Sequence, residues 1–301
     1  MTYSAAISIV MPSFNHAEFI KRSIQSVLSQ DLAPIEIIIQ DGGSTDGTLG
    51  ILAEMAVEEA RICWHSKPDS GPAEAINRAL ARTRGTIIGW LNSDDLYTSG
   101  AVQRAVEALA DPKLLMVYGH GDHIDKAGAH LSKYPTRLPA AGLSGFASGC
   151  FICQPTMFFK RTAHTLLGPL DETLKTSFDM DYWMRAFSRF PDRIGFIDAV
   201  QARSRLHDEC ITQNQRKMVA AEAIALTKRY LGVAEPHWAT THLEEIARDA
   251  RMSSSGEDVR QIMESFLEEV EPHLGSEITQ RLRRQLPNEI APPREAAPRL
   301  T

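Results

Sequence analysis

Residues 86–95 read TIIGWLNSDD, an apolar run that stops at two adjacent carboxylates. A short apolar run with polar residues after it is typical of a strand buried on both faces of a sheet. Three similar runs lie upstream, at residues 7–11, 35–39 and 61–65. Between them, apolar residues recur at helical spacing, so the sequence predicts strands that alternate with helices.

Alternating strands and helices predict an α/β fold with a doubly wound, mostly parallel sheet flanked by helices. Ligands bind such sheets beyond the carboxyl ends of the strands. Polar residues follow each of the four predicted strands, at 13–15, Asp41, Asp69 and Asp94–Asp95. The sequence therefore predicts a ligand site at this edge of the sheet.

The 301 residues suffice for one large domain and a smaller extension. The strand–helix pattern weakens after about residue 110, and residues 135–149 resemble a loop. From about residue 214 the pattern is helical, with Ile262, Phe266 and Val270 on one helix face. We expect a domain over 1–213, a helical extension over 214–290 and a disordered tail over 291–301.

The composition excludes some classes of protein. The net charge of -6 and a pI near 5.9 argue against nucleic-acid binding. The first residues lack the pattern of a signal peptide, and no apolar run is long enough to span a membrane. We therefore expect a cytoplasmic protein. An acidic protein that binds an anionic ligand must offset the repulsion locally, and a bound cation is one way to do so.

The pair Asp94–Asp95 has two interpretations. Hard cations such as Mg²⁺ and Mn²⁺ prefer oxygen ligands, and a cation here would stabilise charge on a diphosphate leaving group. Alternatively, the pair forms a solvated turn or caps the helix expected over 99–109. Asp41, within QDGGSTDGT (40–48), has two interpretations as well: a carboxylate for a nucleobase or ribose, or part of a turn before a capped helix.

Asp179 and Asp181 lie at the start of a helix predicted over 178–190. At this spacing they point to different helix faces, so one can face a site and act as a general base. Negative charge also favours a helix N-terminus on its own. His207 is one of ten histidines, and a lone histidine is usually structural or solvated.

Taken together and in this order, these segments resemble the family 2 glycosyltransferases of the GT-A fold, specifically bacterial enzymes that build surface polysaccharides. The resemblance covers about residues 5–215. It is carried by SIVMPSFN (8–15), QDGGSTDGT (40–48), IGWLNSDDLY (88–97), CQPTMFF (153–159) and FDMDYWMR (178–185).

The resemblance implies roles for individual residues. Asp95 and His207 would ligate Mg²⁺ or Mn²⁺, and Asp94 would contact the ribose or a metal-bound water. Asp179 would be the catalytic base, with Asp181 as the alternative because Phe178 stands where glutamate is common. The implied nucleotide-sugar-binding residues are Pro12, Phe14, Asn15, Asp41, Asp69, Asn77 and Asp94.

It also implies an activity: metal-dependent, inverting transfer from a nucleoside-diphosphate sugar, expected to be a UDP-sugar, to the hydroxyl of a glycan or lipid-linked acceptor. This chemistry serves the synthesis of cell-surface polysaccharide or glycolipid. Residues 1–98 would bind the nucleotide-sugar and 99–213 the acceptor. Apart from the resemblance, the amphipathic pattern of the C-terminal helices predicts that they contact the inner face of the membrane, a partner or a second copy.

Two other classes fit parts of the pattern. A nucleotidyltransferase would carry a Gly-rich loop with a basic residue after its first strand, and Pro12-Ser13-Phe14-Asn15 has neither. A non-catalytic sugar-binding or scaffold protein would not need Asp41, Asp94, Asp95 and Asp179 together.

Overall fold

The computed structural model describes residues 7–31, 34–252 and 259–287, and the tail predicted over 291–301 lies outside them. These described residues divide into two compact units. The first comprises residues 7–145 and 150–214, and the second comprises 146–149 and 215–287.

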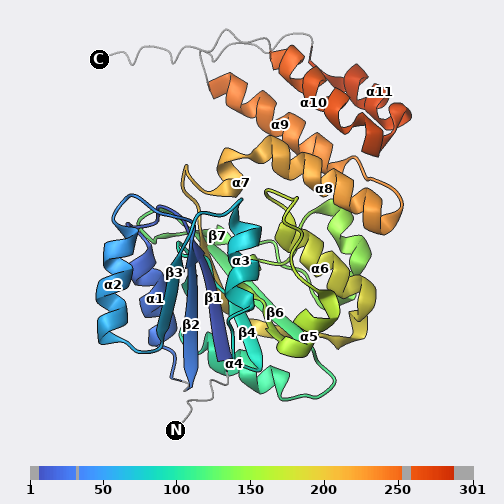
Figure 1. Ribbon diagram of the computed structural model, residues 1–301. Helices are drawn as coiled ribbons and strands as arrows, with labels where there is room; N and C mark the ends of the chain where they lie inside the picture. Colours follow the sequence, from blue (N-terminus) through green and yellow to red (C-terminus); the bar gives the residue numbers. More distant parts are fainter. Residues whose placement is uncertain (1–6, 32–33, 253–258, 288–301) are drawn as a thin grey trace, which may run out of the picture. The chain divides into compact units, whose positions relative to one another are not determined.

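The four apolar runs form a parallel sheet in the first unit (Figure 1). The strands are β1 (Ile7–Ser13), β2 (Ile35–Asp41), β3 (Ile62–Ser66) and β4 (Ile87–Trp90), and they lie in the order β3-β2-β1-β4. All seven residues of β1 and of β2 are buried, as expected for strands covered on both faces. The predicted α/β fold class is confirmed.

Beyond β4 the sheet becomes mixed. The short strand β8 (Phe158–Lys160) runs antiparallel to β4 and to β6 (Met116–Ile124), and β6 is parallel to β9 (Ile194–Arg205). Two more short strands, β5 (Leu96–Tyr97) and β7 (His130–Lys133), pair antiparallel with β9 and β6. The sequence did not predict β5, β7 or β8, because its strand–helix pattern weakens after about residue 110.

Helices cover both faces of the sheet. Alternate residues of β1, namely Ile7, Ile9 and Met11, belong to a core shared with α1 (Ile20–Leu28), α2 (Thr48–Glu58) and α4 (Ala101–Leu109). The helix α3 (Pro72–Leu80) packs on β1 and β2 and lies in front of the strands in Figure 1. The remaining helical segments of this unit are η1 (Pro139–Ala141), η3 (Gln154–Thr156), α5 (Arg161–Leu167), α6 (Phe178–Arg189), η4 (Pro191–Arg193) and α7 (Ile211–Asn214), while η2 (Leu143–Ser148) spans both units.

The second unit is helical, as predicted, and consists mainly of α8 (Arg216–Leu231), α9 (His237–Met252), α10 (Val259–Leu274) and α11 (Ser276–Gln285). Phe266 and Val270 lie in its apolar core, whereas Ile262 is 41% exposed. In the part of the chain that the structure describes, no helix is both long and apolar enough to cross a membrane.

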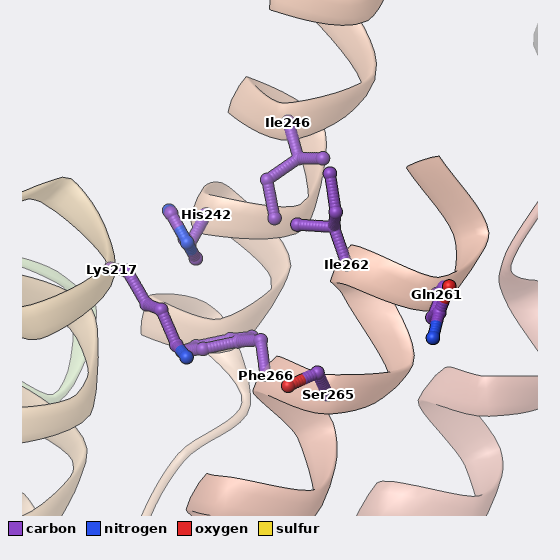
Figure 2. A pocket seen from close by; sticks show the side chains of 7 residues that line it. All are labelled: Lys217, His242, Ile246, Gln261, Ile262, Ser265 and Phe266. Carbon is purple, nitrogen blue, oxygen red and sulfur yellow. The ribbon is translucent and has the colours of Figure 1, made fainter. Parts of the chain in front are cut away.

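A hollow between α8, α9 and α10 of the second unit contains Ile262 (Figure 2). The lysine at its rim, Lys217, pairs with Glu269 at 2.7 Å. None of the site residues predicted from the sequence lies here. The lining residues are Lys217, His242, Ile246, Gln261, Ile262, Ser265 and Phe266.

The packing of β4 predicts one stability effect. A Cβ atom at Gly89 would lie 2.7 Å from Ile9 Cδ1, Phe158 Cε1 and the Tyr97 hydroxyl. We expect Gly89→Ala to lower the free energy of unfolding by about 1–3 kcal/mol through overpacking. The control is Gly50→Ala at an exposed position of α2, where no atom lies within 4 Å of an added Cβ atom. It should raise the free energy of unfolding by about 0.5–1 kcal/mol. Equal urea midpoints for Gly89→Ala and wild type would contradict this account of the core.

Candidate functional site

Polar residues gather at the carboxyl edge of the sheet. Ser13 and Asp41 end the neighbouring strands β1 and β2 and are partners in register. The pair Asp94–Asp95 follows β4, and His207 follows β9 by two residues. The edge therefore collects carboxylate and imidazole groups from segments that are far apart in the chain.

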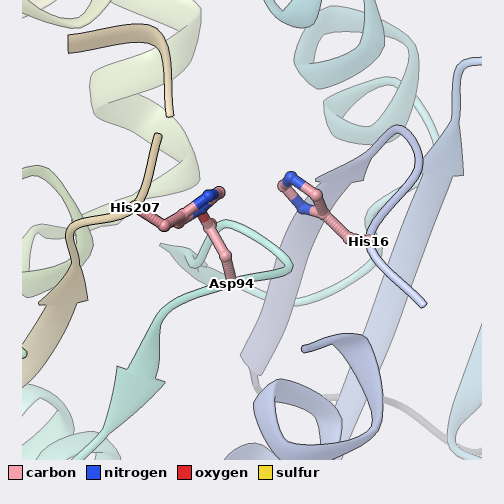
Figure 3. Close-up of side chains that lie close together, drawn as sticks. All are labelled: His16, Asp94 and His207. Carbon is pink, nitrogen blue, oxygen red and sulfur yellow. The ribbon is translucent and has the colours of Figure 1, made fainter. Parts of the chain in front are cut away.

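Three of these side chains form one cluster. His16, Asp94 and His207 each offer a ligand atom, and these atoms all lie within 4.8 Å of one another. The Nε2 atom of His207 lies 3.1 Å from Oδ2 of Asp94, and both residues are buried. Figure 3 shows these two side chains meeting, with the His16 ring pointing toward them from the segment after β1.

Surrounding contacts orient the two imidazole rings. Nδ1 of His16 hydrogen-bonds the Ser93 hydroxyl at 2.6 Å, which leaves Nε2 as the atom that can bind a ligand. The ring of His207 packs on that of Phe19, with centroids 4.8 Å apart. Contacts of this kind hold metal-binding histidines in one ring orientation. His16 was not predicted from the sequence, where its one signal is its place beside Asn15 after a predicted strand.

Asp95 is turned into the protein. Its Oδ1 atom accepts a hydrogen bond from the backbone N–H of Arg205 at 2.8 Å, and Oδ2 accepts one from the Asn92 amide at 3.3 Å. Burial and the neighbouring charge of Asp94 raise the pKa of Asp95 well above its usual range. The sequence paired Asp95 with His207 as metal ligands, whereas the structure brings Asp94 and His16 together with His207.

Asp41 is also committed to internal contacts. It is fully buried, and its Oδ1 atom accepts hydrogen bonds from the backbone N–H groups of Gly43 and Ser44 and from the Ser66 hydroxyl, at 2.7–2.9 Å. The carboxylate therefore shapes the turn after β2, one of its two predicted interpretations. Its contact with a nucleotide stays a prediction.

A more accessible carboxylate lies next to this turn. A Cβ atom built at Gly42 would lie 3.0 Å from Asp69 Oδ2 and 3.3 Å from the Phe14 ring. Phe14 is 58% exposed although it is a large apolar residue. Burial raises the pKa of Asp69 above its usual value, which the backbone N–H of Gly71 partly offsets. The exposed ring of Phe14 and the carboxylate of Asp69 thus border the backbone of Gly42, which has no side chain to cover it.

Three other predicted residues make contacts within the protein. The Asn77 amide donates to the carbonyl of Leu170 and to Glu172, and it accepts from Leu170 N–H. Asn15, with φ 54°, accepts from Thr45 N–H at 2.9 Å. Pro12 is buried within β1. Both N–H groups of the Asn77 amide are therefore used within the protein.

The two aspartates of α6 differ in their surroundings. Asp181 is 2% exposed and pairs with Arg185 at 2.9 Å, while Asp179 is half-buried in the first turn. The ring of Phe178 stacks on that of Trp90 at 5.9 Å, so the start of α6 lies beside the end of β4. Asp179 is therefore the more accessible of the two carboxylates.

The charges of Asp179 and Asp95 both affect the pKa of the buried Cys153 thiol. Burial raises the pKa of Cys153 well above its usual value, and the charges of Asp95 and Asp179 contribute to this rise. Cys153 immediately precedes η3, and Gln154 within η3 donates to the Trp90 carbonyl at 2.9 Å. Both η3 and the start of α6 thus lie beside Trp90 at the end of β4.

Known proteins resemble both the sequence and the fold. An uncharacterized glycosyltransferase of Rickettsia typhi is 30% identical over 219 residues, which cover 69% of this chain and 66% of that protein. The chain spans between about a third and two thirds of the length of the rickettsial relatives that it matches.

Two solved structures share the fold at low sequence identity. Residues 1–349 of S. aureus TarS in complex with UDP-GlcNAc give a TM-score of 0.62 at 16% identity, covering 93% of this chain and 87% of that one. The mannosyltransferase PcManGT of Pyrobaculum calidifontis, in complex with GDP-Man and Mn²⁺, gives 0.59 at 17%, covering 94% and 80%. These likenesses confirm the predicted GT-A fold.

The family itself follows from the sequence. The model of glycosyl transferase family 2 matches residues 8–167, which is more than half of the 301 residues. This stretch begins in β1 and runs to the end of α5, so it contains His16, Asp69 and the turn with Asp94. The chain belongs to glycosyl transferase family 2.

Proposed function

We propose that this chain transfers a sugar, with inversion, from a nucleoside-diphosphate sugar to an acceptor hydroxyl, and that the transfer depends on a divalent cation. Family membership supplies the reaction class. The observation that carries the finer proposal is the cluster of His16, Asp94 and His207 at the carboxyl edge of the sheet. Such an edge is where doubly wound folds bind nucleotides.

The segments after β1 and β2 suit the nucleotide. We assign the exposed Phe14 ring to packing against the base and Asp69 to accepting a hydrogen bond from the base or the ribose. Gly42 lets the ligand approach the backbone, and Asp41 holds the turn in shape. TarS binds UDP-GlcNAc and PcManGT binds GDP-Man, and we propose a UDP-sugar donor here.

The donor set of the cluster fits a cation. One carboxylate and two imidazoles favour Mn²⁺ over Mg²⁺, because Mg²⁺ takes oxygen ligands almost exclusively. We therefore assign His16, Asp94 and His207 as the metal-binding residues. A bound cation would stabilise the negative charge that develops on the diphosphate leaving group.

Asp179 is the proposed general base. It takes the proton of the acceptor hydroxyl, and the acceptor oxygen then bonds to the anomeric carbon on the face opposite the diphosphate, whose bond to that carbon breaks. Asp181 instead pairs with Arg185 at 2.9 Å, which holds the first turn of α6. The proposal requires the carboxylate of Asp179 to face the acceptor, which residues 99–213 would bind.

The acceptor is proposed to be a glycan or a lipid-linked sugar. Contact of the C-terminal helices with a membrane or with a second copy, and a cytoplasmic location, stay predictions. Membership of the family favours glycosyl transfer over nucleotidyl transfer and over a scaffold role. The product decides, because a nucleotidyltransferase releases pyrophosphate and a glycosyltransferase releases a nucleoside diphosphate.

The donor assignment predicts stabilisation by UDP in the presence of Mn²⁺. At 100 times its Kd, a ligand adds about 2.7 kcal/mol of stability, which moves the Tm of a chain of this size by several degrees. We expect UDP with Mn²⁺ to raise the Tm, and Phe14→Ala to abolish most of the rise. The control is Leu131→Ala, which alters an exposed residue of β7. If GDP but not UDP raises the Tm, the donor proposal is wrong.

The two neighbouring carboxylates predict different losses. Asp94→Asn removes a proposed ligand and should weaken Mn²⁺ binding at least about 100-fold, since even outer contacts of metal sites contribute 10–100-fold. Asp95→Asn should leave most Mn²⁺ affinity but lower stability by about 1–3 kcal/mol, because its new N–H would face the Asn92 amide. Titration of Mn²⁺ followed by electron paramagnetic resonance measures the affinity of both variants, and urea unfolding measures the stability of Asp95→Asn. The reverse ranking would restore Asp95 as the ligand.

The two aspartates of α6 provide a third comparison. Asp179→Asn should lower kcat by about 10²–10⁴-fold, the usual contribution of a general base, while the Kd for the donor stays unchanged. Asp181→Asn serves as the matched variant, and we expect it to lower the Tm with a far smaller change in kcat. Full activity in Asp179→Asn would rule out this base.

A further inference from the structure

Arg205 is the last residue of β9 and is 2% exposed. A buried charge is costly unless hydrogen bonds and neighbouring charges compensate it. Arg205 precedes His207, one of the proposed metal-binding residues, by two positions. The proposed function gives Arg205 no role, so its contacts need a separate explanation.

The guanidinium group joins two segments through their backbones. Its Nε atom donates to the carbonyl of Asp94 at 2.8 Å. Its Nη1 atom donates to the carbonyls of Asp125 and Lys126, both at 2.9 Å, in the turn between β6 and β7. The backbone N–H of Arg205 also donates to the Asp95 carboxylate at 2.8 Å. Arg205 thus holds the turn that carries Asp94 from two sides.

The same side chain reaches the two histidines through Phe19. The guanidinium carbon lies 5.1 Å from the centre of the Phe19 ring, and that ring lies 4.8 Å from the ring of His207. The backbone N–H of Phe19 donates to the carbonyl of His16 at 3.0 Å. Arg205 therefore contacts, directly or through one residue, every segment that contributes to the cluster.

We propose that Arg205 is a positioning residue that sets the distances among His16, Asp94 and His207 by bonding the turn after β4 and packing under Phe19. The proposal rests on the proposed function, because it takes the cluster to be the metal site. The side-chain bonds described above end on backbone carbonyls, so the fork of N–H groups matters as well as the charge. Lysine keeps the charge but cannot reproduce a planar fork.

The test compares Arg205→Lys and Arg205→Met with Arg203→Met. Arg203 lies on the same strand, is exposed and serves as the control. Mn²⁺ is titrated into each protein, and electron paramagnetic resonance gives the Kd and the spectrum of the bound ion. We expect the Kd to rise about 10–100-fold in both Arg205 variants, as for other residues that orient metal ligands, and to stay unchanged in Arg203→Met.

Two further readouts separate positioning from general stability. At temperatures far below the Tm, a purely structural role would leave the Kd for Mn²⁺ and the spectrum as in wild type, even if the Tm falls. A positioning role changes both, and it raises the Mn²⁺ concentration needed for half-maximal rate while kcat at saturating Mn²⁺ largely recovers.

The outcomes are distinct. Wild-type affinity and spectrum in Arg205→Lys would overturn the positioning role while leaving the metal site intact. If Arg205→Met does not fold, the lysine variant alone decides in the same way. If the wild-type protein does not bind Mn²⁺, the proposed metal site itself fails, and the positioning role fails with it.

Discussion

Two adjacent carboxylates follow a buried parallel strand within a few residues, and the structure must accommodate both. Asp94 is 7% exposed and Asp95 is 2% exposed, so water cannot solvate their charges fully. Neighbouring carboxylates at such burial repel each other, which is one reason that the pKa of Asp95 is raised. The arrangement is stable only if hydrogen-bond donors or cations surround the pair.

The second half of the sheet supplies those partners. Strand β9 returns beside β6 and pairs with β5, which begins one residue after Asp95. Its last residue donates a backbone N–H to Asp95, and the chain then carries His207 to Asp94. Strand β9 and its partners thus bring residues from late in the sequence to the turn after β4, which comes early in the sequence. The strands that complete the sheet therefore also supply the partners that compensate the buried charges of Asp94 and Asp95.

This dependence explains what the sequence could and could not predict. The buried runs of β1, β2 and β4 are long enough to reveal strands, and the rule for parallel sheets then locates the edge where Asp94 lies. Strands such as β5 and β8 span only two and three residues, which is too short for an alternation of apolar and polar residues to be recognised. The place of His16 depends on the Ser93 hydroxyl, which is remote in sequence. Only the folded chain shows such a contact.

The choice between paired carboxylates follows from the same physics. In each pair one member is held by internal partners: Asp95 by the Arg205 backbone and Asp181 by Arg185. The other member is the more exposed: Asp94 meets His207, and Asp179, which accepts a hydrogen bond from the Met180 N–H, is half-buried. A more deeply buried carboxylate is harder for a cation or an acceptor hydroxyl to reach, and weakening its internal contacts is costly there. The more buried member fixes the turn or helix start, and its more exposed neighbour is the one that we propose for the chemistry.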